Sequence, residues 1–168
     1  ASRKFYDIED INSETYIQLT KRMQEANAPG LYKRVLKDAC NIGTSLLQHN
    51  YPYETIDSDF FTSIIQMPFF EDTSKWNTMA KPSFNPEAKV NTLDDYLYAA
   101  EEFIAKVKAN GALGLKMIVR KTNDPSRKVA MEIFRELKEG NIKELPLENP
   151  LFDYVFDQII TIATNHDL

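Results

Sequence analysis

The sequence has few of the residues that usually hold a metal ion or form a disulfide bond. It contains one cysteine, Cys40, and two histidines, His49 and His166, among 168 residues. A lone cysteine cannot form an internal disulfide, and no His-x-His, His-x-x-His or Cys-x-x-Cys spacing is present to hold zinc. The residues of this chain therefore predict no metal site. Because Cys40 stands among apolar residues in a helical pattern, we expect a buried thiol in a reducing compartment, the cytoplasm.

Several other features are missing, and each absence excludes a class of protein. No apolar run is long enough to cross a bilayer, and the first residues do not lead into the apolar core of a signal peptide. The formal net charge of -5 and the pI of about 5.1 disfavour binding to nucleic acid or to anionic membranes. There is also no glycine-rich phosphate loop, no Ser-His-Asp order and no Cys-His pair. We therefore expect a water-soluble protein whose partners include neither nucleic acid nor a membrane.

The composition is that of a globular domain. Hydrophobic residues make up 43% of the sequence and charged residues 27%, which is enough apolar side chain to build one core. We therefore expect residues 1–168 to be a single domain or a segment of one. No internal repeat and no low-complexity tract divides the chain.

Five segments have the apolar spacing of amphipathic helices. They cover residues 12–26, 31–39, 92–110, 125–140 and 149–163. The segment Thr92-Leu93-Asp94-Asp95 resembles a capping box, in which the first and last side chains bind backbone amides at the start of a helix. Asn12 or Ser13 can cap the first helix in a similar way, and Gly140 is a typical helix end.

Three short apolar segments predict buried β-strands, at residues 42–48, 60–67 and 112–119. Between the second strand and the next helix lies a stretch, residues 68–91, with three prolines, a lone Trp76 and no clear period. We interpret this stretch as a long surface loop or lid. Helices that alternate with short strands indicate βα units and a parallel sheet, and so a helix-rich α/β fold.

Several phrases of the sequence are similar to one known family. They are DIEDIN at 7–12, EANAPGLY at 25–32, TLDD at 92–95 and ANGALGLK at 109–116. Together with the last predicted helix, these phrases resemble the early and middle part of the amidohydrolase-2 type of metal-dependent hydrolases. The resemblance covers nearly the whole chain, and it consists of scaffold phrases and not of a catalytic signature.

The resemblance implies that this chain is the middle segment of a (β/α) TIM-type barrel. In that family a divalent metal, usually zinc, is held by a His-x-His pair on the first strand, histidines on the fifth and sixth strands and an Asp on the eighth. None of these ligands is recognisable here, and a complete barrel usually needs ~250 residues. We therefore expect a partial barrel, truncated at both ends, that binds no metal alone and is inactive without the remaining strands.

Three residues are candidates for a site. Lys116 is a lone charge in a strand predicted to be buried, which is costly unless the amine is paired, modified or at the open end of the strand. It would be catalytic, binding a substrate carboxylate or, if carboxylated, a metal; alternatively its stem lies along the strand and its amine reaches solvent. His49 and Arg120 follow predicted strands, on the active-site side of a barrel, and would bind substrate; alternatively they are a turn residue and a solvated loop residue.

Two classes of function remain. The first is a metal-dependent hydrolase that cleaves a C–N or ester bond in a small carboxylated substrate, or a related decarboxylase, completed by the rest of its barrel or by a homo-oligomer partner. The alternative is a non-catalytic α/β protein-interaction module that binds its partner through an apolar stripe or a strand edge.

Overall fold

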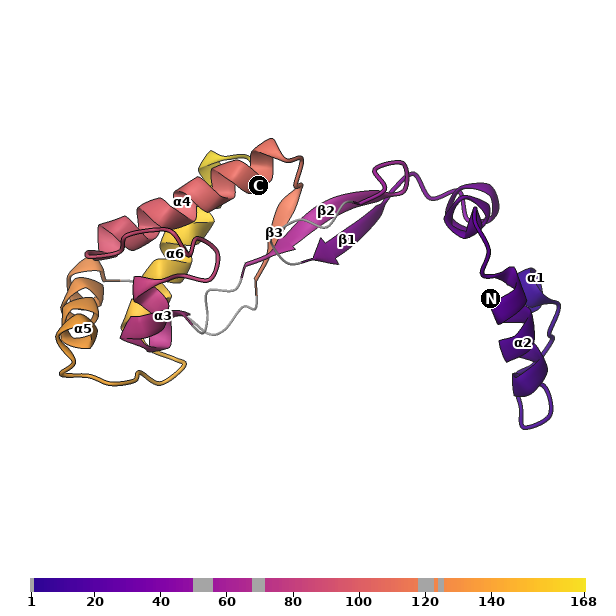
Figure 1. Ribbon diagram of the computed structural model, residues 1–168, viewed down its shortest axis with the longest axis horizontal. Helices are drawn as coiled ribbons and strands as arrows, with labels where there is room; N and C mark the ends of the chain where they lie inside the picture. The colour runs from indigo at the N-terminus through magenta and orange to yellow at the C-terminus, as the bar shows by residue number, and fades with distance from the viewer. Residues whose placement is uncertain (1, 50–55, 68–71, 118–122, 124–125) are drawn as a thin grey trace. The chain divides into compact units, whose positions relative to one another are not determined.

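The computed structural model describes residues 2–49, 56–67, 72–117, 123 and 126–168 (Figure 1). The chain separates into two compact units, Ala1–Ser45 and Leu46–Leu168, which we call unit 1 and unit 2. The fold is mixed α/β, with one small sheet and a large helical fraction. No helix within these described ranges is both long and apolar enough to cross a membrane.

Unit 1 consists of short helical segments with little buried surface. They are α1 (Ser2–Tyr6), α2 (Tyr16–Ala26) and the π-helical segment η1 (Lys33–Ala39), none of which buries a residue. The helix predicted at residues 12–26 begins later, at Tyr16, because the Asn12 side chain accepts hydrogen bonds from the amides of Glu14 and Thr15 in the turn before it. Helix α1 was not predicted from the sequence.

Cys40 ends η1 and its thiol is free and exposed. The prediction of a buried thiol is therefore wrong. Residues 31–39 do have the apolar spacing of a helix, but η1 buries none of its side chains. A residue on its apolar side is therefore not part of a core.

Unit 2 contains a three-stranded parallel sheet with the order β1-β2-β3. Its strands are β1 (Ser45–His49), which begins at the last residue of unit 1, β2 (Phe61–Gln66) and β3 (Gly114–Lys116). In the parallel pair of β2 and β3, Ile64, Ile65 and Gln66 stand opposite Gly114, Leu115 and Lys116. Figure 1 shows the arrow of β1 running in the same direction as β2. The predicted parallel α/β arrangement is confirmed, although each strand is shorter than the apolar segment that predicted it.

The helices of unit 2 begin and end where the sequence places capping residues. They are α3 (Trp76–Ala80), which follows the 3-10 turn η2 (Asp72–Ser74), α4 (Leu93–Ala109), α5 (Arg127–Glu139) and α6 (Pro150–Asn165). The capping box of α4 is complete, since Thr92 Oγ1 accepts from the Asp95 amide at 3.1 Å and the Asp95 carboxylate accepts from the Thr92 amide at 2.9 Å. Asn149 caps α6, and Gly140 ends α5 with a φ of 78° that favours glycine.

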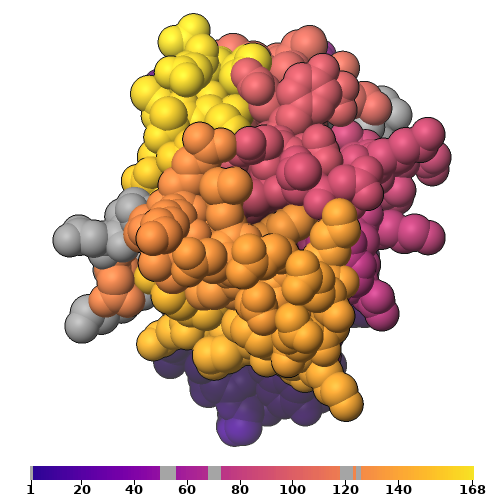
Figure 2. Space-filling model, turned by 90° about the vertical axis from the view of Figure 1, so that its left-hand side faces the viewer, coloured from indigo at the N-terminus to yellow at the C-terminus, as the bar shows by residue number. Residues whose placement is uncertain are grey.

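One hydrophobic core holds unit 2 together. Helix α6 packs against both α4 and α5, and in Figure 2 the residues of α5 and the segment after it lie beside those of α6 and α4. The largest fully buried side chains come from β2, α3, α4, α5 and α6, and they are Tyr96, Phe152, Ile65, Met67, Met79, Ile104, Leu137, Leu151, Ile159, Val107 and Val155. The core therefore joins the helices to one side of the sheet.

The segment predicted as a long surface loop, residues 68–91, contributes to this core. Residues 68–71 lie outside the described residues, but the rest includes η2 and α3 and buries Met79, Phe84 and Val90. The Trp76 ring meets the ring of Phe134 edge to face at 5.4 Å between centroids. Scattered apolar residues without a helical or strand period thus anchor the segment by tertiary contacts that periodicity does not reveal.

Candidate functional site

The sheet has two faces with different surroundings. Side chains alternate along a strand, and partners in register share a face. The side chains of Gln48 and Gln66 are hydrogen-bonded at 2.7 Å, so they lie on the same face of the sheet. Their alternate neighbours on β1 and β2 share that face. The resulting open face carries Leu46, Gln48, Ile64, Gln66, Gly114 and Lys116, and the core face carries Leu47, His49, Ser63, Ile65 and Leu115.

Burial separates the two faces clearly. On the core face, Ile65 is 0% exposed and Ser63 is 4% exposed, and Leu115 packs against the core. On the open face, Leu46 is 60% exposed and Lys116 is also exposed. None of the six residues of the open face belongs to the hydrophobic core or packs against it. The helices therefore cover one face of the sheet. The six residues of the other face are exposed or half-buried, and no described core residue packs against them.

The carboxyl ends of the strands bring polar side chains to one edge of the open face. Parallel strands end at the same edge of a sheet, and β2 and β3 end at the paired residues Gln66 and Lys116. Gln48 lies one residue before the end of β1 and contacts Gln66. We call Gln48, Gln66 and Lys116 the polar row.

Lys116 is held in place by its backbone, and its charge is exposed. The carbonyl oxygen of Lys116 accepts a hydrogen bond from the Met67 amide at 3.1 Å. For its ammonium group, the described residues provide no hydrogen bond and no ion pair. An exposed ammonium keeps most of its hydration, so the burial cost expected from the sequence does not arise. The amine is therefore free to bind an anion at the end of the sheet.

The structure does not bring the three predicted site residues together. His49 lies on the core face, half-buried, with its Nε2 2.9 Å from the Ser63 hydroxyl oxygen. It is thus on the opposite side of the sheet from Lys116. Arg120 lies outside the described residues. Gln48 and Gln66 were not predicted from the sequence, because their place beside Lys116 depends on strand register.

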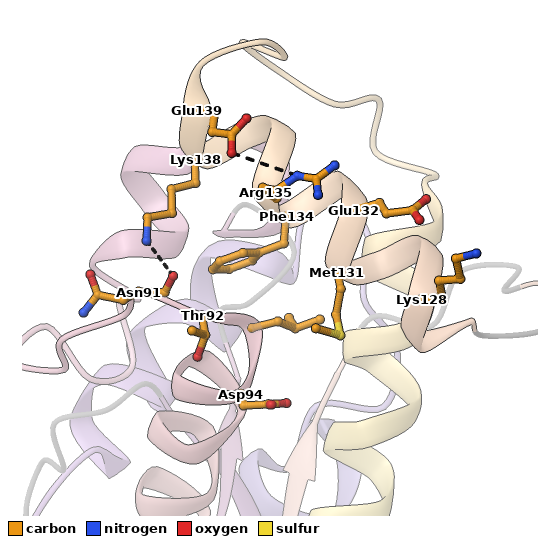
Figure 3. A pocket seen from close by; sticks show the side chains of 11 residues that line it. Asn91, Thr92, Asp94, Lys128, Met131, Glu132, Phe134, Arg135, Lys138 and Glu139 are labelled. Atoms are coloured by element: carbon orange, nitrogen blue, oxygen red, sulfur yellow. Dashed lines mark hydrogen bonds and ion pairs between the residues drawn. The ribbon is translucent and has the colours of Figure 1, made fainter.

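A hollow lies between the start of α4 and α5 (Figure 3). Its volume is about 570 Å³, and Phe134 and Met131 point into it. Part of its charged rim is paired within the protein: Lys138 Nζ donates to the Asn91 carbonyl oxygen at 2.8 Å, and Arg135 lies 4.0 Å from Glu139. Lys128 and Glu132 also line it. We interpret this hollow as a packing groove between two helices.

The acidic pair at the start of α4 has a structural role. Hydrogen bonds from the backbone amides of Asn91 and Thr92 hold the pKa of Asp95 below its ordinary value. Asp94 forms an ion pair with Arg127 at 2.8 Å. Across the described ranges, no group of three or more histidine, cysteine, aspartate or glutamate side chains is placed to hold a metal ion.

Comparisons with known proteins do not assign the chain to a family. No protein-family model matches it, and no curated protein matches it.

Proposed function

We propose that unit 2 is a section of a (β/α) barrel of the amidohydrolase-like metal-dependent hydrolases, with the open face of the sheet turned towards the barrel interior. The single observation that supports this proposal is the open face itself. Helices cover one side of a parallel sheet, and the other side is apolar along the strands and polar at their carboxyl ends.

This arrangement is what a barrel requires. A (β/α) barrel keeps its helices outside the strands, fills its interior with side chains from the other face and places its active site at the carboxyl ends. Leu46 and Ile64 have the apolar character of interior-filling residues, whereas the polar row lies where catalytic and binding residues belong. A doubly wound sheet, in contrast, has helices on both faces.

The family resemblance supplies the reaction class, which is hydrolysis of a C–N or ester bond in a small carboxylated substrate, or decarboxylation. A divalent metal, zinc in the first instance, would activate water when bound. The described residues hold no suitable group of ligands, so we assign the metal to strands supplied by further sequence or by another chain, and we derive no step through it. The role that we assign to this chain is binding: the Lys116 ammonium holds the carboxylate of the substrate.

The test is hydrolysis of small N-acyl amino acids and carboxylated esters by the protein as isolated from its source. We expect a chelator to abolish activity, zinc to restore it, and Lys116→Met to raise KM. Lys143→Met is the matched control, because Lys143 is an exposed lysine outside the sheet. Activity that survives the chelator, or equal effects of the two substitutions, would contradict the proposal. So would strong metal-dependent hydrolysis by the 168-residue chain alone.

A protein-interaction module is the second candidate, and the exposure of Leu46 favours it. Leu46 is 60% exposed on β1, which is an edge strand of the sheet. An exposed edge strand is a common place for another chain to pair. A monodisperse 168-residue monomer that unfolds cooperatively and binds no metal would favour this candidate over the hydrolase.

A further inference from the structure

We propose that the polar row is a carboxylate-binding site in which Gln66 and Lys116 are the donors and Gln48 positions Gln66. The inference rests on the proposed function in one respect, namely that the bound carboxylate belongs to the small-molecule substrate. It gives individual roles to Gln48 and Gln66, to which the proposed function assigns none.

The hydrogen bond between the two glutamines sets the orientation of Gln66. Gln48 Nε2 donates to Gln66 Oε1 at 2.7 Å. An amide group carries its oxygen and nitrogen on different sides, so the Gln66 nitrogen, with two N–H donors, is left on the other side of the group from Gln48. Lys116 is the neighbour of Gln66 across the β2–β3 pair. Neighbouring strands lie about 4.8 Å apart, so both donors can reach the two oxygens of one carboxylate.

The charge of the open face favours a carboxylate over a phosphate. Lys116 is the one charged residue among the six that form this face, and its partners in the polar row are neutral amides. One positive charge with neutral donors suits a monoanion, whereas a phosphate dianion is usually bound by several cations or by a helix N-terminus. None of the six described residues that form the open face has a carboxylate side chain that would compete for the ammonium.

Gly114 leaves room beside the row for the rest of the bound molecule. It stands opposite Ile64 on the open face, two residues before Lys116. A Cβ atom added at Gly114 would have no atom within 4 Å other than those of Gly114 and its two chain neighbours. Glycine in a strand can mark a bulge, a bend or a site where a ligand or another backbone approaches closely. Gly114 and Ile64 border this space, and we assign it to the apolar part of the carboxylated molecule.

The test is equilibrium dialysis of radiolabelled benzoate and acetate against the protein as isolated, with benzamide as the neutral analogue of benzoate. We expect saturable binding of benzoate and no binding of benzamide. Gln66→Leu and Lys116→Met should each weaken binding of both carboxylates by roughly tenfold or more, because each removes a hydrogen bond to a charged group. Gln18→Leu, at an exposed position of α2, and Lys143→Met should leave binding unchanged.

Gly114→Ala gives a second variant that does not depend on the polar side chains. Its methyl group meets no atom of the protein, so the fold should persist, and it should weaken binding of benzoate while leaving binding of acetate unchanged. Equal binding of benzamide, unchanged affinity in Gln66→Leu, or no saturable binding of either carboxylate would overturn the inference. Dialysis measures binding and not hydrolysis, so the two proposals can fail separately. Carboxylate binding without metal-dependent activity would reject the proposed function alone. Metal-dependent activity that does not depend on Gln66 would reject this inference alone.

Discussion

Ile64 and Ile65 are identical side chains at adjacent positions of one strand, yet their surroundings differ completely. Ile65 is 0% exposed within the hydrophobic core, whereas Ile64 is half-buried on the open face and belongs to no core cluster. The same contrast holds for the polar pairs, since His49 and Ser63 meet on the core face and Gln48 and Gln66 meet on the open face. Residue type therefore does not determine burial in this sheet, and the face on which a residue lies does.

The largest effect should come from truncating the two isoleucines in turn. Ile65→Ala should lower the free energy of unfolding by about 2–5 kcal/mol, because it leaves a cavity in a packed core. Ile64→Ala should lower it by less than about 1 kcal/mol, since its side chain has no core contacts to lose. Urea unfolding of both variants measures the difference. Equal losses would show that the open face is packed as tightly as the core face.

The cap of α6 should come next, because this helix belongs to the layer that covers the core face. Asn149 is 6% exposed, and its Oδ1 accepts from the Phe152 amide at 2.8 Å. Asn149→Ala should cost about 1 kcal/mol, the usual contribution of a helix cap. Thermal unfolding measures this loss, and Asn77→Ala, at an exposed position of α3, is the control. An unchanged midpoint would show that α6 is held by packing alone.

Gly114→Ala should have a smaller effect of opposite sign on the free protein. The new methyl group meets no atom within 4 Å, and alanine reduces the freedom of the unfolded chain, so stability should rise by about 0.4–1 kcal/mol. Differential scanning calorimetry can measure this change. A loss of stability would mean that the space beside Gly114 is filled by the fold and is not left open for a ligand.

The smallest effect should come from Asp95, which lies at the start of α4. Hydrogen bonds from the Asn91 and Thr92 amides lower its pKa, so its contribution to stability is present above the pKa of the unfolded chain and is lost as the pH falls through the lower folded pKa. Asp95→Asn should therefore reduce the loss of stability on acidification. Urea midpoints between about pH 5 and pH 2 measure it. An identical acid dependence in the variant would contradict the role of this carboxylate.

Local signals predicted much of the helical layer. The capping box at Thr92, the glycine at 140 and the Asn149-Pro150 start fixed the boundaries of α4, α5 and α6 closely, because caps act through neighbouring residues. The burial of Met79 and Phe84 in the supposed loop was not predictable in this way, since it depends on contacts with distant helices. Cys40 was placed wrongly for a similar reason, because an apolar pattern does not show whether another element covers it.

The candidate site was predictable only in part. Lys116 stands out in the sequence as a lone charge in an apolar strand. Gln48 and Gln66 do not stand out, because their position beside Lys116 depends on strand register and on which face the helices cover.

The most direct test of a barrel interior at the open face is native mass spectrometry, with metal analysis, of the protein isolated from its source. We predict a species well above 19.4 kDa, as a longer chain or a complex with a second polypeptide, that carries a stoichiometric divalent metal. A metal-free species of 19.4 kDa would contradict the barrel and would favour the interaction module.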